Sequence, residues 1–242
     1  MPVLISPDGR WWWDGTKWRS RVVEGKLDLF WFSSTPEWFA RVVITGLIGL
    51  IPIVGTINLL GWTLTATDMV RRGWKELPPA GFQYLERGVA PFVVGLVYGV
   101  VLILVVGILA VFTLVFAMSG SHRVVIAIGF ALVILLFAVA WWLISLYLLA
   151  AVLVASDRLG IAKAIDPTRL FALARANHDN SLHVALVYLA ASIAIATISV
   201  ATSFIVPFSS LVISLGVPVV YAMVVPALVA FRTDPAPSPP PS

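Results

Sequence analysis

The sequence predicts an all-α integral membrane protein with one re-entrant or broken helical hairpin, four transmembrane helices, interfacial helices and a small N-terminal β-hairpin. The first observation is composition: of 242 residues 60% are hydrophobic and 12% charged, and the mean hydropathy is +0.99. Soluble domains are far more polar. The second is a set of four long uncharged stretches, and the third is a one-sided distribution of Lys and Arg. Together they place the chain in a lipid bilayer.

The N-terminal residues 1–27 predict a separate Trp-rich module on the cytoplasmic side. Asp14-Gly15 is a tight-turn signal with aromatic residues on both sides, which predicts a β-hairpin with cross-strand aromatic contacts. Its aromatic residues are Trp11, Trp12, Trp13 and Trp18. Two strands alone are marginally stable, so we expect this module to dock on a partner, on lipid headgroups or on the membrane domain.

Residues 28–232 form the predicted helical membrane domain, and its first helix has a recognisable start. Thr35 can cap a helix, Pro36 fits the first helical position, and Glu37 favours the positive end of the helix dipole. The hairpin segment therefore begins at residue 36, and it extends to residue 73.

The middle of this segment is broken at Pro52. Proline lacks an amide hydrogen and clashes with the preceding turn, so the first helix must end there. The run Val42–Ile51 covers only about 15 Å, half of the hydrocarbon core. A second helix can restart near Thr56 or Asn58. The break, marked by Pro52, Gly55 and Asn58, leaves two alternatives: one kinked span or two half-membrane helices.

Four stretches each exceed the roughly 20 apolar residues that a transmembrane helix needs. They predict spans at about 89–118, 124–155, 183–206 and 208–231.

The basic residues distinguish the two alternatives for the hairpin. If the segment 36–73 turns back, 15 of the 16 Lys and Arg residues fall on one side and Arg123 alone on the other. If it spans, six basic residues of the tail join Arg123, which gives seven against nine. Loops rich in Lys and Arg are cytoplasmic. We therefore expect a re-entrant hairpin and a plasma-membrane protein with both termini in the cytoplasm.

Two cytoplasmic loops predict interfacial helices. Asp166-Pro167 starts one, in which apolar residues alternate with Arg169 and Arg175 until the polar stretch 177–180 ends it. A shorter one is predicted over 82–87. The tail 233–242 is Pro-rich and is predicted to be disordered.

Small residues in the second apolar stretch predict close helix packing. Gly95 and Gly99 form a G-x-x-x-G pair, and Gly107 lies two turns further along the same face. The packing partner is either another helix of this chain or a second copy, so homo-oligomer formation stays open.

No residue pattern predicts an enzyme, a metal site or a cofactor. The sequence holds no nucleophile motif, phosphate loop or paired carboxylates, and Asp68 and Asp157 lie at helix ends where solvated roles are ordinary. His178 and His183 lack the spacing of a helical metal-ligand pair, which favours a capping or interfacial role. The net charge is only +4 and basic runs are absent, which argues against a nucleic-acid partner.

Two segments resemble known bacterial families. The first resemblance is to the membrane family called domain of unknown function 4013, over about residues 36–231. It is carried by Leu50-Ile51-Pro52-Ile53-Val54-Gly55, Leu59-Leu60-Gly61-Trp62, Arg71-Arg72-Gly73, Leu77-Pro78 and Gly95-Leu96-Val97-Tyr98. The Trp-rich core at 12–18, within about residues 6–19, is similar to a short module called domain of unknown function 2510. Neither resemblance implies catalytic residues.

These observations favour a non-enzymatic scaffold or accessory protein of the bacterial plasma membrane. Its partners would be the lipid bilayer and a cytoplasmic or membrane protein, reached through the Trp-rich module and the interfacial helices. The alternative is a channel or permease for a small solute that uses the broken hairpin near the bilayer midplane. An enzyme acting on lipids would need a polar cluster that the sequence does not reveal.

Overall fold

A computed structural model describes residues 11–13, 18–20, 29–118, 124–201 and 206–233. The elements are β1 (Trp11–Trp13), β2 (Trp18–Ser20), the 3-10 helix η1 (Trp31–Ser34) and the helices α1 (Trp38–Gly49), α2 (Val54–Arg71), α3 (Leu85–Met118), α4 (Val124–Leu159), α5 (Ile161–Ala164), α6 (Pro167–Ala176), α7 (His178–Ala201) and α8 (Val206–Ala230).

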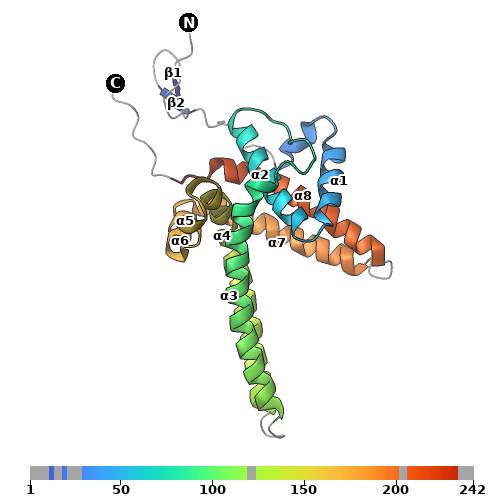
Figure 1. Cartoon of the computed structure of the whole chain (residues 1–242), viewed down its shortest axis with the longest axis vertical. Helices are drawn as coiled ribbons and strands as arrows, with labels where there is room; N and C mark the ends of the chain where they lie inside the picture. Colours follow the sequence, from blue (N-terminus) through green and yellow to red (C-terminus); the bar gives the residue numbers. More distant parts are fainter. Residues whose placement is uncertain (1–10, 14–17, 21–28, 119–123, 202–205, 234–242) are drawn as a thin grey trace.

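Four helices, α3, α4, α7 and α8, are long and apolar enough to cross a membrane. They correspond to the four predicted spans, so among the described residues the prediction of four helices long and apolar enough to cross a membrane is confirmed. The helices α3 and α4 extend further toward the charged loops than predicted, to Leu85 and Leu159. The two helix pairs α3–α4 and α7–α8 leave the rest of the molecule in different directions (Figure 1).

The outer parts of α3 and α4 form a bare two-helix projection, which we call the arm (residues 100–118 and 125–145). Its large apolar side chains are exposed, for example Ile103 at 70% and Leu136 at 68%. In Figure 1 this pair descends from the other helices without a neighbour. The arm therefore has no protein core of its own.

The remaining helical structure forms what we call the packed region: η1, α1, α2, α5, α6 and α8, with the adjoining ends of α3, α4 and α7. Two clusters of buried side chains form its core. One centres on Trp62, which is fully buried among η1, α2 and α8, and the other on Leu153 and Leu170, which join α4 to α6.

Helices α1 and α2 form the predicted broken hairpin. Helix α1 ends at Gly49, and α2 begins at Val54, two residues before Thr56, the earlier of the two expected restarts. The second helix starts sooner because Gly55 packs directly on the last turn of α1, with space for no side chain beside the Ile48 carbonyl group. The chain then returns to where it entered, since the segment before α1 is bonded to the segment after α2.

The predicted start of α1 is wrong in its details. Helix α1 begins at Trp38, and Glu37 adopts a left-handed backbone conformation with φ of 58°. Thr35 does not cap the helix, because its hydroxyl accepts a hydrogen bond from the backbone amide of Leu77 at 3.1 Å. A long-range contact has taken the side chain that the local pattern assigned to capping.

The loop between α4 and α7 contains the predicted interfacial helix. The Asp166 carboxylate accepts a bond from the Thr168 amide at 3.0 Å and caps α6. The polar stretch 177–180 ends α6 as predicted but is not a loop. Only Asn177 lies between the two helices, and α7 begins at His178. The Asn177 side chain is bonded to both backbone groups of Arg232, at 2.8 and 2.9 Å.

The second predicted interfacial helix, over 82–87, is wrong as a separate element. Helix α3 begins at Leu85 and absorbs its second half. At the N-terminus, β1 and β2 pair antiparallel with Trp13 opposite Trp18, and in the described part of the chain they contact no helix. The predicted turn at Asp14-Gly15 and the tail from 234 lie outside the described residues, so the N-terminal hairpin as a unit remains a prediction.

Candidate functional site

The residues that join α2, α3 and α4 at their charged ends form the candidate site. Its first part is the loop 77–81, which side chains from other elements hold in place. The Leu77 amide donates to Thr35, and the Arg41 guanidinium donates to the Leu77 carbonyl. Both partners precede or lie in α1, so the loop after α2 is fixed to the start of the hairpin.

The next carbonyl groups of this loop are bonded in the same way. The Trp62 indole donates to Pro78 at 3.2 Å and the Asn58 amide to Gly81 at 2.9 Å. The Tyr84 hydroxyl donates to Pro79 at 2.7 Å. Burial in this position raises the pKa of Tyr84. Thus α2 carries side chains on two successive turns that bind a loop which follows it in the chain.

Helices α2 and α3 cross with their backbones in contact. A β-carbon added at Gly61 would overlap the carbonyl group of Tyr84, and one added at Gly88 would overlap that of Ile57. Only glycine fits at both positions, because a side chain would displace backbone rather than a mobile side-chain end. This crossing brings the charged ends of the two helices together.

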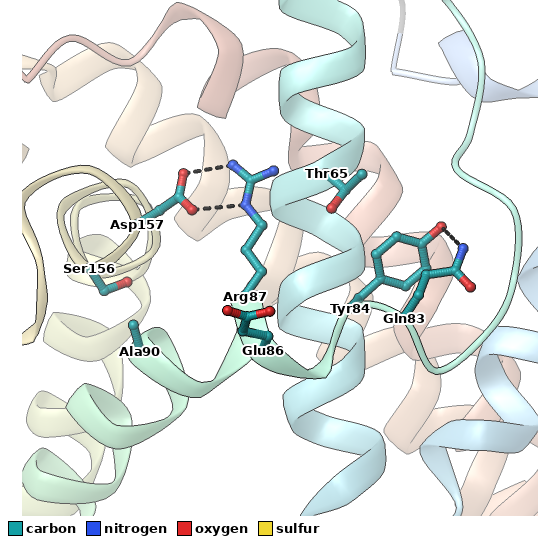
Figure 2. Close-up of a pocket in the computed structure, with 8 residues that line it drawn as sticks. All are labelled: Thr65, Gln83, Tyr84, Glu86, Arg87, Ala90, Ser156 and Asp157. Atoms are coloured by element: carbon teal, nitrogen blue, oxygen red, sulfur yellow. Dashed lines mark hydrogen bonds and ion pairs between the residues drawn. The ribbon is translucent and has the colours of Figure 1, made fainter.

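A chain of alternating charges lies beside the crossing, and Figure 2 shows its Arg87–Asp157 pair. The Arg87 guanidinium, on α3, binds the Asp157 carboxylate of α4 through two bonds of 2.8 Å. The same group donates to Asp68 of α2 at 2.7 Å. Such two-pronged contacts are the strong form of an ion pair. Arg87 thereby ties three helices together.

Arg71 extends the ion-pair chain to α8. It lies 3.5 Å from Asp68 and donates to the carbonyl oxygens of Leu228 and Val229 at 2.5 and 3.3 Å. Those carbonyls belong to the last turn of α8, where helices leave acceptors without partners. Burial first, and then the charge of Arg158, lower the pKa of Arg71 to about 10. The guanidinium therefore stays charged at neutral pH.

An open cleft of about 530 Å³ lies next to Arg87. Figure 2 shows its lining, which comprises Thr65, Gln83, Tyr84, Glu86, Arg87, Ala90, Ser156 and Asp157. The hydroxyls in it are engaged: Thr65 donates to Gly61 and Ser156 to Leu153. The Asp157 carboxylate is bound to Arg87, and Glu86 supplies a second carboxylate to the lining. Among the described residues there is no group of three metal-ligating side chains.

The structure places the predicted hairpin residues apart from this cleft. Pro52 lies at the exposed tip between α1 and α2, with Ile51 and Ile53 exposed at 42% and 62%. Two backbone amides near the tip donate hydrogen bonds to carbonyl groups of the tip itself: Val54 to Pro52, and Gly55 to Ile51. Asn58 is 1% exposed and holds the loop 77–81 instead of lining a path.

The predicted packing glycines lie on the open side of α3. A β-carbon at Gly95, Gly99 or Gly107 would meet nothing within 4 Å. Within one copy of the chain they give no close helix contact, and their packing role stays a prediction for contact with a second copy. The closest backbone contacts fall at Gly61 and Gly88 instead.

The ion-pair chain was not predicted from the sequence. The predicted solvated roles of Asp68 and Asp157 are wrong, because their side chains are only 32% and 17% exposed and bind Arg87. A signal was present. If α1 and α2 form a hairpin, the end of α2, the start of α3 and the end of α4 share one side of the membrane. Each of these three helix ends carries both an acidic and a basic residue.

The sequence profile of a family described as "Protein of unknown function (DUF4013)" matches residues 44–208. The match covers more than half of the chain and includes the loop 77–81 and the residues Asp68, Arg87 and Asp157. It leaves the Trp-rich segment outside, whose likeness to domain of unknown function 2510 stays a resemblance. No curated protein and no solved structure matches the chain.

Proposed function

We propose that this protein, which belongs to the DUF4013 family, is a non-enzymatic scaffold or accessory protein of the bacterial plasma membrane with its aqueous surface on the cytoplasmic side. One observation carries the proposal: the charged side chains Arg87, Asp157 and Asp68 bind one another and so join α2, α3 and α4. The hydroxyls of Thr65 and Ser156 each bind the backbone of their own helix. Such a site is suited to holding a rigid surface.

The proposed membrane placement is supported by the length of the arm. Its exposed apolar stretches, 100–118 on α3 and 125–145 on α4, cover about 28 and 32 Å at the rise of a helix. The hydrocarbon core of a bilayer is about 30 Å thick. An arm that spans the core leaves the charged ends of α2, α3 and α4 at one surface. The excess of Lys and Arg at that end favours the cytoplasm.

The hairpin α1–α2 is proposed to enter this face without crossing. Helix α1, from Trp38 to Gly49, covers about 18 Å, too little for a span. Its exposed tip is apolar, and the amides of Val54 and Gly55 are bonded locally. A tip of this kind tolerates lipid and does not require a wet cavity, which favours an anchor over a pore.

Topology is the first test. The chain has no native cysteine, so single cysteines at Ser34, Trp74 and Gly120 can be labelled from outside intact cells with a membrane-impermeant reagent. We expect reaction only at position 120. Ser34 and Trp74 flank the hairpin and are exposed, so reaction at one of them but not the other would show that the hairpin spans the membrane.

The scaffold role is tested by its partners. We expect a variant lacking residues 1–26 to lose specific proteins that co-purify with the intact chain, while the membrane domain still folds. An unchanged partner set would contradict the proposal. Solute flux into proteoliposomes that is abolished by Pro52→Ala would instead establish a channel or permease.

A further inference from the structure

A second cleft lies on the opposite side of α4, between α4, α6 and the start of α7. It encloses about 550 Å³ and is lined by Tyr147, Phe171, Ala172, Arg175 and His178. None of these residues takes part in the ion-pair chain. The lining combines two groups that can carry positive charge with aromatic and aliphatic surface, and it contains no acidic side chain.

The Tyr147 hydroxyl positions one polar group of this cleft, the His178 imidazole. The Tyr147 hydroxyl lies 3.3 Å from the Ala174 carbonyl and 3.1 Å from His178 Nδ1. This contact orients the imidazole and leaves its Nε2 for a ligand. Arg175 is exposed and forms no ion pair within the described part of the chain.

The charges around the cleft favour an anion. His178 is the first residue of α7, so the positive end of that helix dipole faces the same region. Two carboxylates are near in sequence. Asp166 is bonded to Thr168 at the far end of α6, and Asp179 is exposed and does not line the cleft.

The apolar part of the cleft continues onto the arm. Phe171 is 46% exposed on α6, and Leu143, one turn before Tyr147 on α4, is also 46% exposed. A free phosphate ion gains no binding energy from an apolar surface, and it would bind more tightly in an enclosed polar site. A ligand with a charged head and an apolar chain matches both halves.

We propose that this cleft binds the phosphate of an anionic phospholipid between Arg175 and His178, with an acyl chain along Phe171 and the α4 side of the arm. The proposal rests on the proposed placement of this end of the molecule at the bilayer surface. Helix α6 then lies among the headgroups, with Leu170 and Ala174 turned into the protein core and Arg175 toward lipid. Polar faces of interfacial helices commonly attract anionic lipids in this way.

Native mass spectrometry of the full chain in neutral detergent, titrated with phosphatidylglycerol or phosphatidylcholine, tests the proposal. We expect a phosphatidylglycerol adduct whose affinity falls about fivefold in Arg175→Gln, the value for one basic group near a lipid surface. Phosphatidylcholine binding should not depend on position 175. Arg169→Gln is the matched control, because Arg169 lies on the same helix and is exposed but does not line the cleft.

Three outcomes would overturn the proposal. Equal losses in Arg175→Gln and Arg169→Gln would indicate unspecific charge attraction, and no preference for phosphatidylglycerol would exclude an anionic lipid. Glycerol phosphate binding as tightly as the lipid, with the same dependence on Arg175, would identify a soluble ligand. Labelling of Ala172→Cys from outside intact cells would reverse the proposed topology while leaving the lipid affinity intact, so the two proposals can fail separately.

Discussion

The arm and the packed region are organised in opposite ways, although α8 of the packed region is nearly as apolar as α3 and α4. In the packed region glycines admit neighbouring backbone, as Gly61 and Gly88 do, and the indole of Trp62 is fully buried. In the arm the glycine at 107 faces open space, and Ile103 is 70% exposed. The arm needs only hydrophobicity and length, because lipid is an acceptable neighbour on every side. The packed region needs particular side chains at particular positions.

The sharpest test of this contrast is a Gly→Ala substitution in each region, which adds a single methyl group. Gly61→Ala should destabilise the protein by about 3 kcal/mol, because the added β-carbon meets the backbone of Tyr84, which cannot move without separating α2 from α3. Gly107→Ala, in the arm, should be neutral or stabilise by about 0.5 kcal/mol, because its β-carbon meets nothing within 4 Å and alanine favours a helix. Thermal unfolding in detergent, followed by circular dichroism, measures both.

A loss at Gly107 as large as that at Gly61 would contradict this contrast. It would mean that the open face of α3 packs closely on something other than lipid. A second copy of the chain is the first candidate, and cross-linking of Gly99→Cys in membranes would detect it.

The ion-pair chain gives the next largest expected effect. Arg87→Met leaves the largely buried Asp157 without its partner and leaves Asp68 only the 3.5 Å contact with Arg71. Because the group is partly exposed, we expect a loss of about 2 kcal/mol, less than the roughly 3–5 kcal/mol of a fully buried pair. Arg158→Met is the control, since Arg158 is exposed and its loss should cost less than about 0.5 kcal/mol. Equal effects would show that net charge, and not the contact, matters.

A smaller loss of stability is expected when the contact between η1 and α8 is weakened. The Trp31 indole donates to the Ala222 carbonyl at 2.9 Å in a buried contact between η1 and α8. Trp31→Phe keeps most of the apolar surface but removes the donor, which should cost about 1 kcal/mol. Trp74→Phe changes a residue that is 64% exposed and should have no measurable effect on unfolding. A null result at Trp31 would mean that η1 is held by apolar packing alone.

The smallest effect concerns the cap of α6 and its dependence on pH. Hydrogen bonds from Thr168 lower the pKa of Asp166 below its usual value. The ionised carboxylate is thus favoured in the folded state, so its stabilisation is present above about pH 4 and is lost as the pH falls through the folded-state pKa. Asp166→Asn can still cap the helix but does not titrate. Its unfolding temperature should lack this component of the acid dependence, whereas identical acid profiles would contradict the assignment.

Local patterns predicted the elements of this protein well but misassigned several side chains. The apolar runs predicted α3, α4, α7 and α8, and Pro52 predicted the break between α1 and α2. Both predictions depend only on residues close together in the sequence. Thr35 had every feature of a cap, yet it binds Leu77, which is distant in sequence. Asp68 and Asp157 at helix ends look solvated until Arg87 is placed between them. Spacing within one helix cannot reveal such a contact.

The sequence by itself determined that this chain is a helical membrane protein with a broken first segment, because both follow from how much apolar surface each stretch carries and where proline interrupts it. Only the tertiary structure decided which glycines are in contact, which charges are paired and which carbonyls are bound. Those depend on how α2 crosses α3 and on where α8 returns, and both are fixed by packing between residues far apart in the chain. Thus Gly61 and Gly88 hold helices together, whereas Gly95 and Gly99, which match the expected motif, lie open.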